Sequence, residues 1–140
     1  MTPKTLKLTK QPSILERYEQ EAFFSWVRTV RYCGEPILED CHAIPNGSFL
    51  AGDASRRAIQ GDALRRQGVK AGYPDVAIDI AVEPYHGMRI EVKRIGAPTP
   101  PPHQVAAQER LRYRGYRVDV CYGFEQMREA TLQYLGISDK

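Results

Sequence analysis

Two neighbouring runs of β-forming residues constrain the fold of this chain more than any other feature. Residues 75–82 and 88–94 have the length of strands, and a turn-forming segment separates them, so they are expected to pair as a β-hairpin. Side chains two residues apart on a strand share a face. Glu91 and Lys93 are therefore expected to project together from the second strand, while the apolar residues beside them project from the other face.

Helices are expected on both sides of this hairpin in the sequence. Apolar residues recur at helical spacing after Ser13, and Glu16 completes a capping-box pattern with it, so a first helix is expected to run from there to Gly34. Further helices are expected over 54–67, 102–115 and 124–135, a third strand over 117–122, and a short strand within 37–44. This order predicts an α/β fold with a mixed β-sheet and flanking helices.

Length and composition indicate one domain that is not embedded in a membrane. A chain of 140 residues has the usual size of one domain, with residues 1–12 expected as a flexible N-terminal arm and 13–140 as the domain. The best apolar stretch, 76–82, has a charged residue at its centre and is too short to cross a bilayer, and no secretory signal is recognisable. The cysteine number, 3, is odd, which favours reduced thiols and a cytoplasmic location.

Basic side chains gather in two segments, although the net charge is only +3. The first segment contains Arg56, Arg57, Arg65, Arg66 and Lys70, and the second contains Arg110, Arg112, Arg114 and Arg117. Most such runs are solvated helix faces. A partner with a phosphate backbone would account for both segments at once. The charge pattern alone leaves both interpretations open.

The polar residues of the hairpin offer a ligand set for a divalent cation. Asp75 begins the first strand after a Gly-x-Pro bend, which can turn its carboxylate toward the edge of the sheet and toward Glu91 and Lys93. Two carboxylates and a main-chain carbonyl, that of Val92, are hard oxygen ligands suited to Mg²⁺ or Mn²⁺. A bound cation would polarise a phosphate and acidify a water, and Lys93 could hold that water or offset charge on the phosphate.

Ordered motifs across the chain resemble those of one nuclease family. The motifs around the hairpin are Gly72-Tyr73-Pro74-Asp75, then Ile90-Glu91-Val92-Lys93-Arg94, then Gln104 at the opening of a helix. The upstream motifs are Ile44-Pro45-Asn46-Gly47 and Gly68-Val69-Lys70-Ala71-Gly72. Together they resemble the virus-type replication-repair nuclease (VRR-NUC) domain, a branch of the PD-(D/E)xK nuclease superfamily. The resemblance covers about residues 15–135.

The resemblance implies a restriction-endonuclease-like fold, in which a central mixed β-sheet is flanked by helices. It implies that one or more divalent ions bind at Asp75 and Glu91. It also makes Lys93 the catalytic lysine, with Gln104 supplementing the site from its helix.

The family also uses a glutamate of the first helix, both in catalysis and as a metal ligand. Glu19 is the candidate because it lies on the apolar face of the expected helix. Glu16 and Glu21 would point elsewhere on a regular helix. The alternative interpretation of Glu19 is a solvated helix residue.

The activity implied by the resemblance is metal-dependent hydrolysis of DNA phosphodiester bonds by an endonuclease. Stand-alone members resemble Holliday-junction resolvases that act as dimers, so a four-way junction is the expected substrate and a homodimer the expected assembly. Flaps, DNA ends and restriction sites are alternative targets, and a non-catalytic DNA-binding module is a further alternative. The residues expected to contact DNA are Arg56, Arg57, Arg65, Arg66, Lys70 and Arg94.

Overall fold

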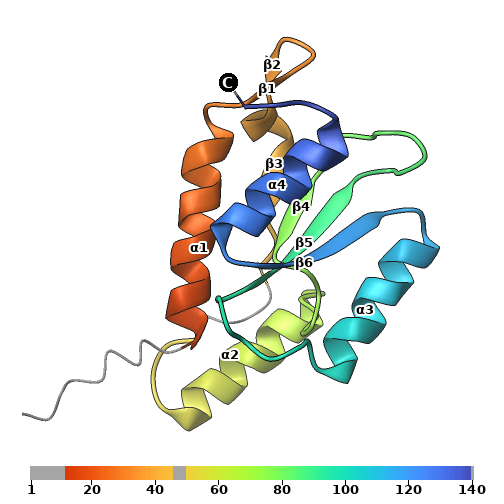
Figure 1. Ribbon diagram of the computed structural model, residues 1–140. Helices are drawn as coiled ribbons and strands as arrows, with labels where there is room; N and C mark the ends of the chain where they lie inside the picture. Colours follow the sequence, from red (N-terminus) through yellow and green to blue (C-terminus); the bar gives the residue numbers. More distant parts are fainter. Residues whose placement is uncertain (1–11, 46–49, 140) are drawn as a thin grey trace, which may run out of the picture.

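The computed structural model describes residues 12–45 and 50–139, which form a four-stranded sheet with flanking helices (Figure 1). The strands, in spatial order, are β3 (Cys41–Ala43), β4 (Val76–Ile78), β5 (Met88–Lys93) and β6 (Arg117–Tyr122). The pairs β3–β4 and β4–β5 are antiparallel, whereas β5 and β6 are parallel. The expected α/β class, the mixed sheet and the hairpin formed by β4 and β5 are confirmed.

The helices are α1 (Pro12–Val27), α2 (Ala54–Arg66), α3 (Pro102–Tyr113) and α4 (Phe124–Leu135). The last three agree with the expected helices to within two residues at each end. The expected N-terminal arm lies almost entirely outside the described residues. Within the described ranges, no helix is both long enough and apolar enough to span a membrane.

The first helix is shorter than expected, because a small hairpin follows it. The helix ends at Val27, and the segment up to Gly34 does not continue it. The elements after it are β1 (Arg31–Tyr32), β2 (Glu35–Pro36) and the 3-10 helix η1 (Ile37–Asp40). Cys33 and Gly34 connect the two strands with φ angles of 51° and 83°, and two successive positive φ values define a type I′ hairpin turn.

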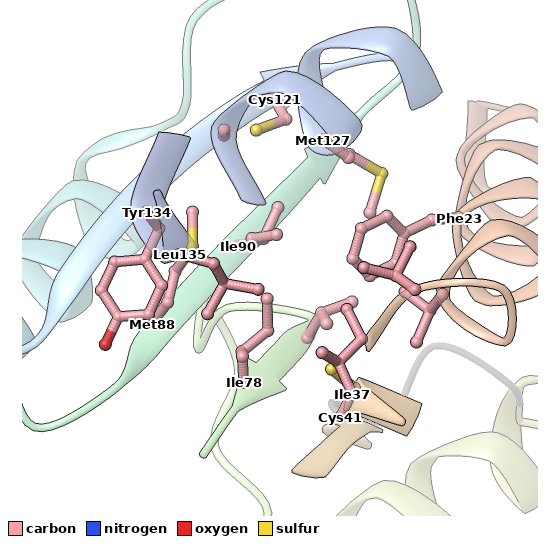
Figure 2. Close-up of a cluster of buried hydrophobic side chains, with 14 of the residues drawn as sticks. Phe23, Ile37, Cys41, Ile78, Met88, Ile90, Cys121, Met127, Tyr134 and Leu135 are labelled. Atoms are coloured by element: carbon pink, nitrogen blue, oxygen red, sulfur yellow. The ribbon is translucent and has the colours of Figure 1, made fainter. Parts of the chain in front are cut away.

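Helices α1 and α4 cover one face of the sheet and enclose the hydrophobic core (Figure 2). Met88, Ile90 and Val92 of β5 are at most 1 % exposed on this face. They belong to one cluster with Phe23 of α1 and Met127 of α4, both 0 % exposed. Because successive side chains of a strand point to opposite faces, this burial directs the remaining side chains of β5 to the other face.

On that other face, α3 packs mainly against β6 and reaches β5 at its first turn. A parallel pair such as β5 and β6 needs a crossover connection, and α3 supplies it. Gln108 and Leu111 are the buried residues of α3. Gln104, one turn before Gln108, contacts Lys93 of β5. The charged side of β5 therefore lies beneath the first turns of α3.

The first strand of the large hairpin is shorter than the expected residues 75–82. It pairs only over Val76–Ile78, and the next amide, that of Asp79, donates to the Asp40 carbonyl with an N···O distance of 2.8 Å. The hydroxyl of Tyr134 on α4 then donates to the Ile80 carbonyl at 2.6 Å and accepts from the Val82 amide at 3.2 Å. A tyrosine side chain, rather than a neighbouring strand, thus satisfies the main chain after β4.

Candidate active site

The candidate site lies where β5 extends past the beginning of β4. A ladder bond joins the Asp75 amide to the Ile90 carbonyl at 3.0 Å. Two residues further along β5, the Val92 amide donates to the Asp75 carboxylate at 2.8 Å. The Asp75 carboxylate thus accepts a main-chain hydrogen bond that a neighbouring strand would otherwise accept, and this bond fixes the side chain beside β5.

The carbonyl of Val92 faces the same edge. The main-chain N–H and C=O of one strand residue point to the same side, and those of the next residue point to the opposite side. The Lys93 carbonyl accepts from the Gly123 amide at 2.9 Å, on the side of β6, whereas the Val92 amide bonds to Asp75. The Val92 carbonyl is therefore directed to the side of Asp75, where it can act as an oxygen ligand.

Glu91 is a buried carboxylate with one oxygen that lacks a partner. The residue is 4 % exposed, and its Oε2 makes no hydrogen bond. Burial, assisted by the charges of Asp75 and Glu16 and opposed by Lys93, raises the pKa of Glu91 to about 8. A buried polar atom without a hydrogen bond is costly. A cation beside this oxygen would offset that cost.

Lys93 is held between Glu91 and Gln104. Its Nζ donates to the Gln104 Oε1 at 2.7 Å and lies 3.6 Å from the Glu91 Oε1. The lysine side chain is only 11 % exposed, so its ammonium group has little freedom to move. The structure brings Asp75, Glu91, Lys93 and Gln104 together, as expected from the sequence.

The glutamate of α1 that reaches this site is Glu16, and the choice of Glu19 is corrected by its position. The Glu19 carboxylate accepts a hydrogen bond from the Phe124 amide at the start of α4, a helix whose N-cap residue offers no side-chain oxygen. Glu16 is partly buried, which raises its pKa, whereas the charge of Lys93 and a hydrogen bond from the Arg94 main chain lower it.

Glu16 and Glu19 have different neighbours because they lie on successive turns of α1. Glu19 lies on the apolar face of α1, and its carboxylate is engaged by the Phe124 amide at the start of α4. Glu16 lies one turn closer to the N-terminus, beside Lys93. The capping box predicted for Glu16 depends on the side chain of Ser13, which lies outside what the structure describes.

The residues present fit a divalent cation through a mixed ligand set. Within residues 12–45 and 50–139, no three His, Cys, Asp or Glu side chains are grouped so as to hold a metal ion by themselves. Asp75 and Glu91 supply two carboxylates, and the Val92 carbonyl supplies a main-chain oxygen. Hard oxygen donors of this kind suit Mg²⁺ or Mn²⁺, which keep several waters in protein sites.

Comparison with solved structures identifies the family. A structure described as "VRR_NUC domain protein" is similar over 89 % of this chain and 91 % of its own, with 31 % sequence identity and a TM-score of 0.74. The chain belongs to the VRR-NUC family. No protein-family model matches the chain, and no curated protein matches it. The VRR-NUC domain is a nuclease-type domain, in agreement with the expected fold.

The first basic segment of this VRR-NUC domain lies on an exposed helix. In Figure 1, α2 lies outside the sheet, near the ends where α1 and α3 begin. No residue of α2 is buried, and its four arginines are exposed, as is Lys70 after it. Arg65 pairs with Asp62, while Arg94 is partly buried beside Glu16. Apart from Arg94, the predicted DNA-contacting side chains therefore lie on a surface open to a partner.

The second basic segment divides into structural and exposed arginines. Arg112 donates to the Val118 carbonyl at 2.8 Å, and Arg117 pairs with Asp119 at 3.0 Å, so both hold the VRR-NUC fold together. The guanidinium groups of Arg110 and Arg114 lie 5.5 and 5.4 Å from the ring centre of Tyr113. Arg110 and Arg114 are exposed and can meet a partner.

Proposed function

We propose that this VRR-NUC domain is a metal-dependent endonuclease that hydrolyses DNA phosphodiester bonds. The observation that carries the proposal is the buried Glu91, whose Oε2 has no hydrogen-bond partner and whose pKa is raised to about 8 beside Asp75. A protein that only binds DNA does not need two carboxylates in this arrangement, whereas a cation-assisted hydrolase does.

Asp75, Glu91 and the Val92 carbonyl would hold the cation, with Glu16 close enough to contribute charge. A bound Mg²⁺ or Mn²⁺ supplies polarisation of the phosphate and a more acidic water. The ligand geometry is prepared by the chain itself, because the Val92 amide holds the Asp75 carboxylate in place.

Lys93 would act on the reacting phosphate. An ammonium group carries three donors. Gln104 accepts one of them and keeps the group at the site, and Glu91 attracts it from 3.6 Å. The remaining hydrogen-bonding capacity can hold the attacking water or offset the negative charge that develops on the phosphate.

The proposed substrate is branched DNA, bound by a homodimer. One chain contributes one Asp75–Glu91–Lys93 site, whereas resolving a four-way junction requires two cuts on opposing strands. A two-fold dimer would place two identical sites symmetrically about the junction. The exposed arginines of α2 support binding to the phosphate backbone beside the site.

The test is cleavage of a labelled four-way junction, a flap and a linear duplex in Mg²⁺, Mn²⁺ or EDTA. We expect cation-dependent cleavage that is lost in Asp75→Ala and Glu91→Ala. Asp79→Ala is the matched control, because that carboxylate pairs with His42 and Arg89 at 3.0 and 3.4 Å instead. Full cleavage by Asp75→Ala would contradict the proposed chemistry.

The preferred branched substrate and the assembly are tested separately. Light scattering at micromolar concentration is expected to give the mass of a dimer, and a cruciform plasmid is expected to be cut in both strands during one binding event. A monomer that only nicks the cruciform, or that prefers a flap, would overturn the junction-resolving role and leave the nuclease chemistry in place.

A further inference from the structure

Gly72 lies three residues before Asp75, and its main chain packs directly against the beginning of α3. Its φ angle is +81°, a conformation that residues with a side chain rarely adopt. A Cβ at this position would lie 2.6 Å from the His103 Cδ2 and 3.3 Å from the His103 carbonyl oxygen. There is no room for a side chain between this loop and the first turn of α3.

Side-chain capping does not fix the first turn of α3. Its N-cap residue is Pro101, which makes no side-chain hydrogen bond to the helix. A helix start without such a cap depends on packing for its placement. The close contact at Gly72 is a packing contact of this kind, and it involves both the ring and the main chain of His103.

The same turn of the helix carries a site residue. Gln104 follows His103 directly and accepts a hydrogen bond from the Lys93 Nζ at 2.7 Å. On the other side of the contact, the chain continues from Gly72 to Asp75, which is bonded to Val92 of the same strand as Lys93. The Gly72–His103 contact therefore joins the two segments that carry Asp75 and Gln104 to β5.

We propose that Gly72 is a positioning residue, whose missing side chain lets α3 come close enough for Gln104 to hold Lys93. This inference rests on the proposed nuclease function, because it gives the contact a role in placing the ammonium group. A Cβ at position 72 would push the His103 main chain outward and carry Gln104 away from Lys93. A displacement of 1 Å at a reacting group can cost about 10²-fold in rate.

The variant Gly72→Ala tests the contact, and Gly34→Ala is its matched control. Gly34 has a φ angle of +83°, lies in the hairpin turn between β1 and β2, and has no atom within 4 Å of a Cβ. Both variants place alanine at a positive φ angle and so share the backbone strain, but only in Gly72→Ala does the new Cβ clash with His103. We expect the cleavage rate at saturating DNA to fall by roughly tenfold in Gly72→Ala, within the limit of about 10²-fold, with KM unchanged. Gly34→Ala should cleave as wild type does.

Two further variants separate positioning from a general loss of structure. In a Gln104→Ala background, Gly72→Ala should cause no additional loss of rate, because the contact acts through Gln104. Adding His103→Ala to Gly72→Ala removes the ring that lies closest to the new Cβ and should restore part of the rate. Independent and additive losses in these combinations would overturn the proposal.

A measurement without cation or DNA tests the role of Gly72 independently of the nuclease activity. The side-chain amide resonance of Gln104 in a ¹H–¹⁵N spectrum, assigned by its disappearance in Gln104→Ala, should shift in Gly72→Ala and stay in place in Gly34→Ala. If wild type cleaves no DNA, the nuclease proposal fails while this resonance still reports on the contact. An unshifted resonance in folded Gly72→Ala would refute the positioning role, whatever the activity.

Discussion

Ionisation of Glu91 should destabilise the cation-free fold as the pH rises. Burial is the main cause that raises the pKa of Glu91 from its usual 4.5 to about 8, and the charge of Asp75 adds to it. Between these pH values the folded protein binds a proton that the unfolded chain has released. The free energy of unfolding should then fall by about 1.4 kcal/mol per pH unit through this one group.

The sign and the pH window follow from the raised pKa. Below pH 4.5 the carboxyl is protonated in both states, and the stability that it contributes is fully present. That stability is lost as the pH rises toward 8, and it stays lost above this value. Across the whole window the loss amounts to at most about 5 kcal/mol, a large part of the stability of a domain of this size.

The assay is chemical denaturation in EDTA at pH 5, 6, 7 and 8, followed by circular dichroism. Glu91→Gln cannot ionise, so its stability advantage over wild type should grow by about 1.4 kcal/mol with each pH unit. Asp75→Asn should end the loss of stability at a lower pH than in the wild type, because it removes a charge that raises the pKa of Glu91. Glu129→Gln, on the exposed side of α4, is the control and should follow the wild type.

One result would refute this reasoning. If wild type and Glu91→Gln lose stability in parallel, Glu91 does not take up a proton on folding, and the substitution changes stability only through local packing. In the predicted case, Mg²⁺ at pH 8 should stabilise the wild type more than Glu91→Gln, since a bound ligand stabilises the state that holds it.

Three other outcomes are expected. Reversing Arg65 and Arg66 to Glu should weaken binding to all DNA sequences alike and reduce the log–log salt slope by about 0.9 for each phosphate that is no longer neutralised, measured by fluorescence anisotropy. Glu19→Ala should cost about 1 kcal/mol in denaturation while cleavage continues, because it removes the carboxylate that caps α4, whereas Glu16→Gln should reduce cleavage at nearly unchanged stability. Phe23→Ala, which empties a fully buried position, should cost about 3–5 kcal/mol by the same denaturation assay.

The centre of the candidate site could be predicted from the sequence because it depends on strand geometry alone. The two-residue period of a strand places Glu91 and Lys93 on one face, whatever the rest of the fold does. The apolar alternation of β5 then determines that this face is opposite the core. The Gly-x-Pro bend before Asp75 indicated where the neighbouring strand begins, and Asp75 does lie at that edge.

The parts that could not be predicted depend on distant partners. The strand expected over 75–82 ends at Ile78 because Tyr134, far away in the sequence, satisfies the main chain beyond it. The small hairpin after α1 turns through Cys33, which adopts a φ angle of 51° although cysteine is not a usual turn residue. No local pattern indicates either feature.

The two glutamates of α1 show what helical spacing cannot predict: which neighbouring element each residue of a helix face will contact. Spacing identifies which residues share the apolar face, and it correctly groups Glu19 with that face. A single helix face, however, runs past different neighbours along its length. One part of α1 meets the start of α4, where the carboxylate of Glu19 accepts the Phe124 amide, and another part meets the end of β5, where Glu16 lies beside Lys93. Helical spacing shows which face of α1 a glutamate occupies, but which of the two lies beside Lys93 depends on the neighbour that the helix meets at that turn.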